Sequence, residues 1–169
     1  IGCPLGLTRY DPKTEVFRTF ENTIDPSGNS VGQVFIDRQS RLWYSTENGT
    51  FLFNRKKEQF EKAFSGTITD ATDATRRAEG NFKWLQKTAL QTPDGLIWSI
   101  GSTPIGIGLV SVNPETGNSV LYPLKTPFYQ TNKENPIDYD PWLSAFCPDL
   151  KGENIWLGGW RGSLRRFNL

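Results

Sequence analysis

Apolar and polar residues alternate in short runs over the segment 31–64, and polar turns separate these runs. The three interruptions, DRQSR, TENGT and NRKKE, each carry a turn-forming residue. Alternation with a period of two is the pattern of a half-buried β-strand. The segment therefore predicts four short antiparallel strands. The first strand has Val31, Gln33 and Phe35 on one side, and the further alternating apolar positions are Leu42, Tyr44, Phe51, Phe53 and Phe60.

The same pattern returns along the chain. Residues 88–124 repeat all of it, residues 143–169 repeat its first three strands, and residues 1–20 match its second half. In three copies a tryptophan follows the first turn and opens the second strand, at Trp43, Trp98 and Trp156. Because these tryptophans recur at one position of the unit, we expect them to pack between adjacent sheets.

A four-stranded unit of this length is typical of a β-propeller blade, which has roughly 40 to 50 residues. We predict an all-β fold, a β-propeller fragment of about three four-stranded antiparallel blades, cut within blades at both ends, since closed propellers have about four to eight blades. One helical turn is expected near Ala74 to Ala78. The expected parts are the second half of a blade (1–20), a full blade (31–64), an insertion (65–87), a full blade (88–124), a second insertion (125–142) and the first three strands of a blade (143–169).

Three stretches carry a resemblance to a known repeat. PDGLIWSIGS at 93–102, GENIWLGGWRGSLRRFN at 152–168 and GLTRYDPKTEVFRTF at 6–20 resemble the two-component regulator propeller repeat. Gln39-Ser40 departs from that repeat, because the turn glycine is missing there. The resemblance implies a periplasmic or extracellular sensor region of a hybrid two-component system. Such a region binds a ligand, commonly a glycan fragment, and passes the signal to a kinase further along the parent chain.

Composition narrows the chemistry. The 169 residues include 19 basic and 18 acidic side chains, and this near balance gives no electrostatic reason to expect nucleic acid or an anionic membrane. No apolar run approaches the roughly 18 residues that a membrane helix needs. Histidine is absent, which removes Ser-His and Cys-His pairs and the commonest metal ligand. We expect no cofactor, and we expect Cys3 and Cys147 to be unpaired and mostly buried.

Two pairs of carboxylates have the residue type of a catalytic or metal site. Asp138 and Asp140 have the residue type needed to flank a glycosidic bond, and Asp70 and Asp73 have the residue type that calcium prefers. Carboxylates two residues apart in a loop, such as Asp138 and Asp140, are more often solvated. Asp residues among threonines, such as Asp70 and Asp73, more often cap turns. We therefore expect no catalytic residue and no metal ligand.

The connections expected on one face of the blades are the variable ones, and long loops on a rigid scaffold often carry function. Their aromatic and arginine side chains suit a small polar ligand such as an oligosaccharide. The candidate ligand-binding residues are Arg76, Arg77, Trp84, Tyr129, Tyr139, Trp142, Trp160 and Arg161.

Two other functions stay open at this point. A propeller enzyme, such as a lyase or a glycan-active protein, would need a histidine or a carboxylate pair at the axis of the full ring. A protein-interaction scaffold would show a large flat apolar patch on the face with the variable connections. The rest of the parent propeller is an expected partner. An open stack of blades exposes two sheet faces, so a homodimer is also expected.

Overall fold

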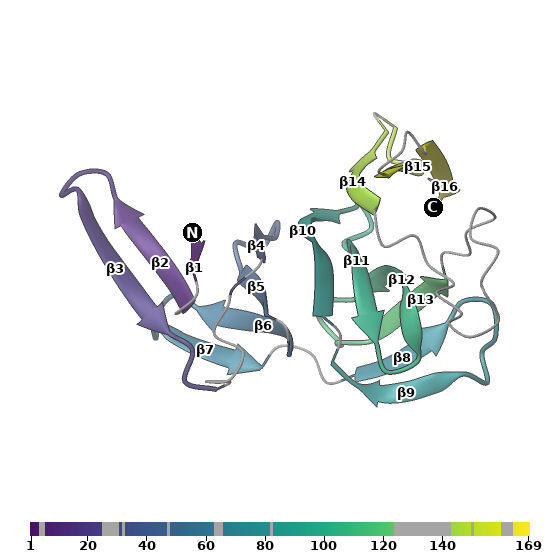
Figure 1. The fold of residues 1–169 in the computed structure, drawn as a ribbon, viewed down its shortest axis with the longest axis horizontal. Coiled ribbons are helices and arrows are strands. Elements are labelled where there is room, and N and C mark those ends of the chain that lie inside the picture. The colour runs from purple at the N-terminus through teal and green to yellow at the C-terminus, as the bar shows by residue number, and fades with distance from the viewer. Residues whose placement is uncertain are drawn as a thin grey trace, which may run out of the picture.

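The computed structural model describes residues 1–3, 6–24, 31, 33–46, 48–62, 66–81, 83–123, 143–149, 151–159 and 164–169. Every regular element in these residues is a β-strand, so the predicted all-β class is confirmed. The strands form sheets that follow one another along the chain, as in a propeller fragment (Figure 1). No helix in this part of the chain is long and apolar enough to cross a membrane.

The first two sheets are antiparallel, and in both of them strands that are neighbours in sequence are paired. The first has the order β1-β2-β3 and the second the order β4-β5-β6-β7. Their strands are β1 (Gly2–Cys3), β2 (Gly6–Asp11), β3 (Val16–Glu21), β4 (Gln33–Ile36), β5 (Leu42–Thr46), β6 (Gly49–Asn54) and β7 (Gln59–Lys62).

The third sheet has the order β10-β11-β12-β13-β8-β9, and the fourth has the order β14-β15-β16. Their strands are β8 (Gly66–Asp70), β9 (Arg77–Gly80), β10 (Lys83–Gln91), β11 (Ile97–Thr103), β12 (Gly106–Val112), β13 (Ser119–Pro123), β14 (Leu143–Pro148), β15 (Asn154–Gly159) and β16 (Leu164–Asn168).

The described part of the first insertion folds as a hairpin at the edge of the third sheet. β8 pairs with β9 and runs parallel to β13. The prediction of a helical turn near Ala74 to Ala78 is wrong, because Ala78 lies in strand β9 opposite Ile68. The run Thr-Ile-Thr in β8 is β-branched throughout, and such residues favour strands over helices. The hairpin extends this blade from four strands to six.

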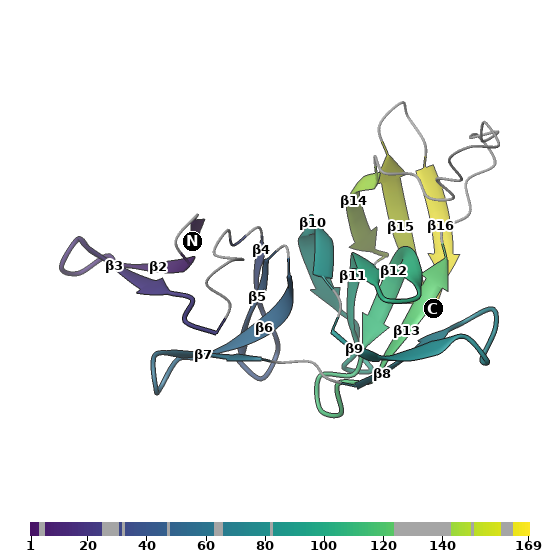
Figure 2. The ribbon, with the colours of Figure 1, turned by 60° about the horizontal axis from the view of Figure 1, so that its bottom comes forward.

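Three successive sheets are arranged around their first strands. β10 lies next to both β4 and β14, and the two ribbon views agree on this arrangement (Figures 1 and 2). Strands in this position are the innermost strands of propeller blades. The sheets then pack face to face, which buries the apolar side chains that alternation predicts.

The repeated tryptophans lie in these interfaces between sheets. Trp43 is 2% exposed and packs against Ile97 and Val110 of the next sheet, and Trp98 is 3% exposed and packs against Ile155 of the sheet that follows. The expectation that these two tryptophans pack between sheets is confirmed. A third cluster joins the first two sheets, and its buried members are Leu7, Val31, Tyr44, Phe51, Phe53 and Phe60.

The last sheet has one covered face and one open face. Ile155 and Leu157 of β15 are buried against the third sheet, whereas Trp156 between them is half-buried. Cys147, which lies opposite Trp156 in the sheet, is free and exposed. The expectation that this thiol is buried is therefore wrong, because no described sheet packs on that face; the side chain of Cys3 lies outside the described residues.

The turn between the first and second strands has the same geometry in three blades. In each turn a backbone N–H donates to the carbonyl of the residue three positions earlier: Ser40 to Asp37 at 2.9 Å, Gly95 to Thr92 at 3.0 Å, and Gly152 to Asp149 at 3.1 Å. The φ angles of the donors Ser40, Gly95 and Gly152 are 62°, 91° and 71°. Ser40 therefore occupies the left-handed position that the other two blades give to glycine.

Changing Ser40 to glycine is expected to raise the free energy of unfolding by about 0.5–1 kcal/mol. A side chain in the left-handed region costs about 1–2 kcal/mol, and the greater freedom of glycine in the unfolded chain offsets part of this gain. Chemical denaturation of both proteins measures the difference.

Gly95→Ala is the matched control for Ser40→Gly. A Cβ at Gly95 would meet no atom within 4 Å, so the expected loss of about 1 kcal/mol comes from backbone strain and not from a steric clash. A destabilised Ser40→Gly protein would contradict the equivalence of the two turns.

Candidate functional site

The structure describes only part of the ligand site expected from the sequence. Five of its eight residues lie outside the described residues: Tyr129, Tyr139, Trp142, Trp160 and Arg161. The backbone of Trp84 is described in β10, opposite Gly101. Arg76 and Arg77 are described in full, and their surroundings can be compared with the role expected of them.

Arg76 braces the β8–β9 hairpin. Its Nη1 donates to Asp70 Oδ2 at 2.8 Å and its Nη2 donates to the carbonyl of Ile105 at 2.6 Å. Burial raises the pKa of Asp70, but hydrogen bonds from Thr72 and the charge of Arg76 outweigh this effect and hold the pKa below its ordinary value. These two bonds join the hairpin to the turn between β11 and β12, and the expected ligand-binding role of Arg76 stays a prediction.

Arg77 and Trp84 are on opposite edges of the third sheet. Arg77 is exposed in β9, the last strand in the sheet order, and Trp84 is in β10, the first. Four strands lie between β9 and β10 in the sheet order, so the two residues are not cross-strand neighbours. The structure therefore does not place these two residues side by side.

The connections expected on the elaborated face meet at one end of the sheets. The β5–β6 turn is joined to the start of β10 by two hydrogen bonds, from Thr50 N to Asn81 Oδ1 at 3.3 Å and from Asn81 Nδ2 to the Thr50 carbonyl at 3.2 Å. The bond from Arg76 to Ile105 lies at the same end of the third sheet. This end is thus a connected framework of described loops.

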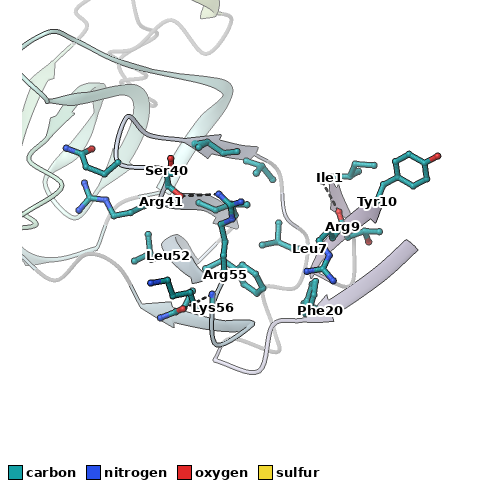
Figure 3. Close-up of a pocket in the computed structure, with 17 residues that line it drawn as sticks. Ile1, Leu7, Arg9, Tyr10, Phe20, Ser40, Arg41, Leu52, Arg55 and Lys56 are labelled. Carbon is teal, nitrogen blue, oxygen red and sulfur yellow. Dashed lines mark hydrogen bonds between the residues drawn. The ribbon is translucent and has the colours of Figure 1, made fainter. Parts of the chain in front are cut away.

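The described residues also form a pocket that sequence reasoning missed. It has a volume of about 1070 Å³ and lies between the first sheet and the second (Figure 3). Leu7 and Phe20 line it from the first sheet, and Val34, Leu42 and Phe53 line it from the second. These side chains make its wall apolar.

Basic side chains surround the mouth of this pocket. Arg9, Arg41, Arg55 and Lys56 line it, and no aspartate or glutamate of the described residues does. Arg41 is already paired, at 2.6 Å from Asp37. The pocket therefore combines an apolar wall with positive charge.

The remaining cations are only partly neutralised. Arg9 and Arg18 share one carboxylate, that of Glu58, at 3.0 and 2.8 Å. Arg55 donates to a backbone carbonyl at 3.3 Å, and Lys56 makes no ion pair within the described residues. Two of the lining cations, Arg55 and Lys56, thus have no ion pair within the described residues.

The pocket is on the opposite end of the sheets from the elaborated face. Its basic residues come from the short turns 37–41 and 54–58 and from the end of β2. The sequence does indicate the positive charge of this pocket, because most charged residues in the turns DRQSR and NRKKE are Arg or Lys. Alternation alone could not reveal the space between the two sheets.

The carboxylates of Asp70 and Asp73, the residue type that calcium prefers, accept hydrogen bonds from nearby threonines of the same turn. Asp73 Oδ1 accepts bonds from the backbone N–H and the hydroxyl of Thr75, at 3.0 and 2.6 Å, and these bonds lower its pKa. Asp70 is bound to Thr72 in the same way, at 2.8 and 2.7 Å. Among the described residues no group of three or more Cys, Asp or Glu side chains has the arrangement of a metal site. Asp138 and Asp140 lie outside the described residues.

Known proteins resemble this chain in fold. No protein-family model matches it, and no curated protein matches it in sequence. It is similar to the extracellular domain of BT4673 from B. thetaiotaomicron, assigned as a hybrid two component system, with a TM-score of 0.60, 19% identity, and coverage of 99% of this chain and 20% of that chain. A second structure of that extracellular domain, assigned as a one component system, has a TM-score of 0.57, 19% identity, and coverage of 99% and 21%.

The extracellular domain of BT3049 from B. thetaiotaomicron, assigned as a hybrid two component system, has a TM-score of 0.56 and 17% identity, with coverage of 98% of this chain and 18% of that chain. The chain thus spans about a fifth of the length of these structures. At such identities the likeness concerns the fold, and it agrees with the predicted all-β propeller fragment.

Proposed function

We propose that this chain is a ligand-sensing propeller segment of a hybrid two-component regulator, located in the periplasm or outside the cell. The observation that carries the proposal is its likeness to extracellular domains assigned to such systems, over 98–99% of its length. The repeat motifs of the sequence, such as PDGLIWSIGS, resemble the same class of sensor independently of the fold. Both lines support a role in binding and relay, with no turnover by this segment.

The proposed ligand is a small polar molecule, an oligosaccharide fragment, held on the elaborated face. The aromatic residues proposed to hold it are Trp84, Tyr129, Tyr139, Trp142 and Trp160, and the charged ones are Arg77 and Arg161. Aromatic platforms with a few polar groups suit sugar rings. The Thr50–Asn81 and Arg76–Ile105 bonds support this assignment, because a rigid framework positions binding loops.

Relay requires two states that the ligand binds unequally. In this proposal the ligand changes how the loops of neighbouring blades sit together, and the rest of the parent propeller passes the change to a kinase outside this chain. Arg76 acts as a positioning residue, since its guanidinium holds the 101–106 region to the hairpin.

A thermal-shift screen of oligosaccharides tests the proposal. A ligand at about 100 times its Kd stabilises the folded state by about 2.7 kcal/mol, which is a readily measured shift. Replacing Trp84, Tyr139, Trp142 or Trp160 by alanine is expected to weaken binding about tenfold for each residue that stacks on a sugar ring, since such a contact is worth about 0.5–1.5 kcal/mol beyond its buried area.

Phe17→Ala is the matched control for these variants, because Phe17 is 63% exposed in β3 and lies outside the elaborated face. The melting temperature of each protein without ligand separates a folding defect from a binding defect. A bound oligosaccharide that none of the four substitutions weakens would overturn the site, and the absence of any oligosaccharide hit would overturn the ligand class.

A further inference from the structure

We propose that the pocket between the first two sheets is a second ligand site, for an organic anion with an apolar body such as a medium-chain carboxylate. It lies at the end of the sheets opposite the proposed sugar site and shares no residue with it. The proposal rests on three features of the pocket: its size, its apolar wall and the charge around its mouth.

The size and the wall suit the apolar part of such a ligand. A volume of about 1070 Å³ is slightly above the range of roughly 300–1000 Å³ that small-molecule sites occupy, so the pocket has room for a medium-sized ligand. Of the apolar side chains that line the pocket, Leu7 and Phe53 are buried and Ile36 is 55% exposed. An alkyl chain placed there would remove apolar surface from water, at about 25 cal/mol per Å².

The charge at the mouth suits the carboxylate end. Figure 3 shows the guanidinium of Arg9 beside the ring of Phe20, with 5.7 Å between its Cζ and the ring centroid, and shows Arg55 on the facing sheet. Arg55 and Lys56 are exposed, and their side chains have no carboxylate partner within the described residues. They are therefore able to donate charge-assisted hydrogen bonds to an anion.

Other ligand classes fit this pocket less well. A neutral sugar needs several convergent polar groups. Among the described residues, the uncharged polar side chains in the lining are only those of Thr8, Gln39, Ser40 and Asn54, besides the phenol of Tyr10, which points outward in Figure 3. An inorganic anion would use the cations and leave the apolar wall open to water. An amphipathic anion is the class that uses both.

A ligand in this pocket would contact both sheets. The two sheets are bridged by ion pairs of Glu58 with Arg9 and Arg18, of which only Arg9 lines the pocket, and these ion pairs are solvent-accessible and therefore weak. An alkyl carboxylate would add apolar contacts between β2 and β4 and would brace the first blade against the second. Binding should therefore raise the melting temperature of the whole chain.

Isothermal titration calorimetry with decanoate, kept below its micelle concentration, tests the site on the complete 169-residue chain. Saturable binding of one equivalent is expected, together with a rise in melting temperature. Decanol, which has the same chain without the charge, and acetate, which has the charge without the chain, are each expected to bind at least about tenfold more weakly. Absence of saturable decanoate binding overturns the proposal, and equal binding of decanol overturns the role of the cations.

Two variants locate the bound decanoate. The double variant Arg55→Gln with Lys56→Gln is expected to weaken binding about tenfold, and its control is Lys151→Gln with Arg166→Gln, two exposed cations of the last sheet. Ile36→Asp places a carboxylate at the pocket edge and is expected to abolish binding, whereas Val16→Asp, at a site 56% exposed outside the pocket, is expected to leave it intact.

The melting temperature of each variant without ligand separates a folding defect from a binding defect. Decanoate affinity that survives both the Arg55/Lys56 change and Ile36→Asp overturns the assignment of this pocket. Equal loss in the control variants overturns it as well, because it would mean that decanoate binds the surface generally.

Discussion

Replacing Trp43 by alanine is expected to lower the free energy of unfolding by about 3–5 kcal/mol. The indole is 2% exposed and lies in the cluster with Ile97, Val110 and Val112 of the neighbouring sheet, so its removal leaves a cavity between two blades. The change also removes the donor that Trp43 Nε1 provides to Asp37 Oδ2 at 2.8 Å. Denaturation in urea, followed by circular dichroism, measures the loss.

Trp156→Ala is the matched control, because Trp156 has the same place in its blade but is half-buried on the open face of the last sheet. Its loss is expected to be about 1 kcal/mol, since little of its surface contacts a second sheet. Losses of equal size in the two variants would contradict the conclusion that packing between blades holds the repeated tryptophans.

The local features of the fold were predictable from short-range patterns. Alternation alone predicts apolar strand positions for Tyr44, Phe51, Phe53 and Phe60, and these residues lie together in one buried cluster. This worked because antiparallel strands joined by tight turns pair with their sequence neighbours. The repeat then supplied a second, independent signal through the shared position of Trp43 and Trp98.

The hairpin at 66–80 was not predictable in the same way. β8 pairs with β13, about 50 residues further along the chain, and this parallel pairing leaves no signal in the local pattern. Its turn, with Asp73 and Thr75, has the composition of a loop or of a helix cap, so the local sequence does not predict a strand pair there. The pairing of β8 with the distant strand β13 determines the structure of this segment.

The two ligand sites differ in what sequence reasoning could supply. Aromatic residues gathered in long connections indicated the elaborated face, but the sheet order places Arg77 and Trp84 on opposite edges of one blade. The pocket was missed because it depends on how far two sheets splay apart. Arg55 and Lys56 look like ordinary turn residues until the first sheet is placed opposite them.

Replacing Asp37 by asparagine is expected to cost about 2–4 kcal/mol, because it breaks a buried ion pair by removing one partner. The carboxylate is fully buried and accepts from the Arg41 side-chain Nε at 2.6 Å, from the Arg41 backbone N–H at 2.8 Å and from Trp43. The lower part of the range allows for the partial exposure of Arg41. Glu115→Gln is the control, since its ion pair with Arg41 is exposed and is worth at most about 1 kcal/mol.

The same substitution predicts a change in pH dependence. Burial raises the pKa of Asp37, but hydrogen bonds from Trp43 and Arg41, with the charge of Arg41, outweigh burial and hold the pKa below its ordinary value. A carboxyl with a lowered pKa in the folded state adds stability above its unfolded pKa of about 3.9, and this stability is lost as the pH falls through the lower, folded value.

The difference in unfolding free energy between the natural protein and Asp37→Asn should therefore be constant from about pH 6 to pH 5 and should shrink below about pH 4. Asp70 and Asp149 also have lowered pKa values, so both proteins lose stability in acid, and only the difference between them reports on Asp37. A difference that stays constant down to pH 3 would show that the asparagine acts through packing, and that the charge of Asp37 does not contribute to the Trp43–Arg41 network.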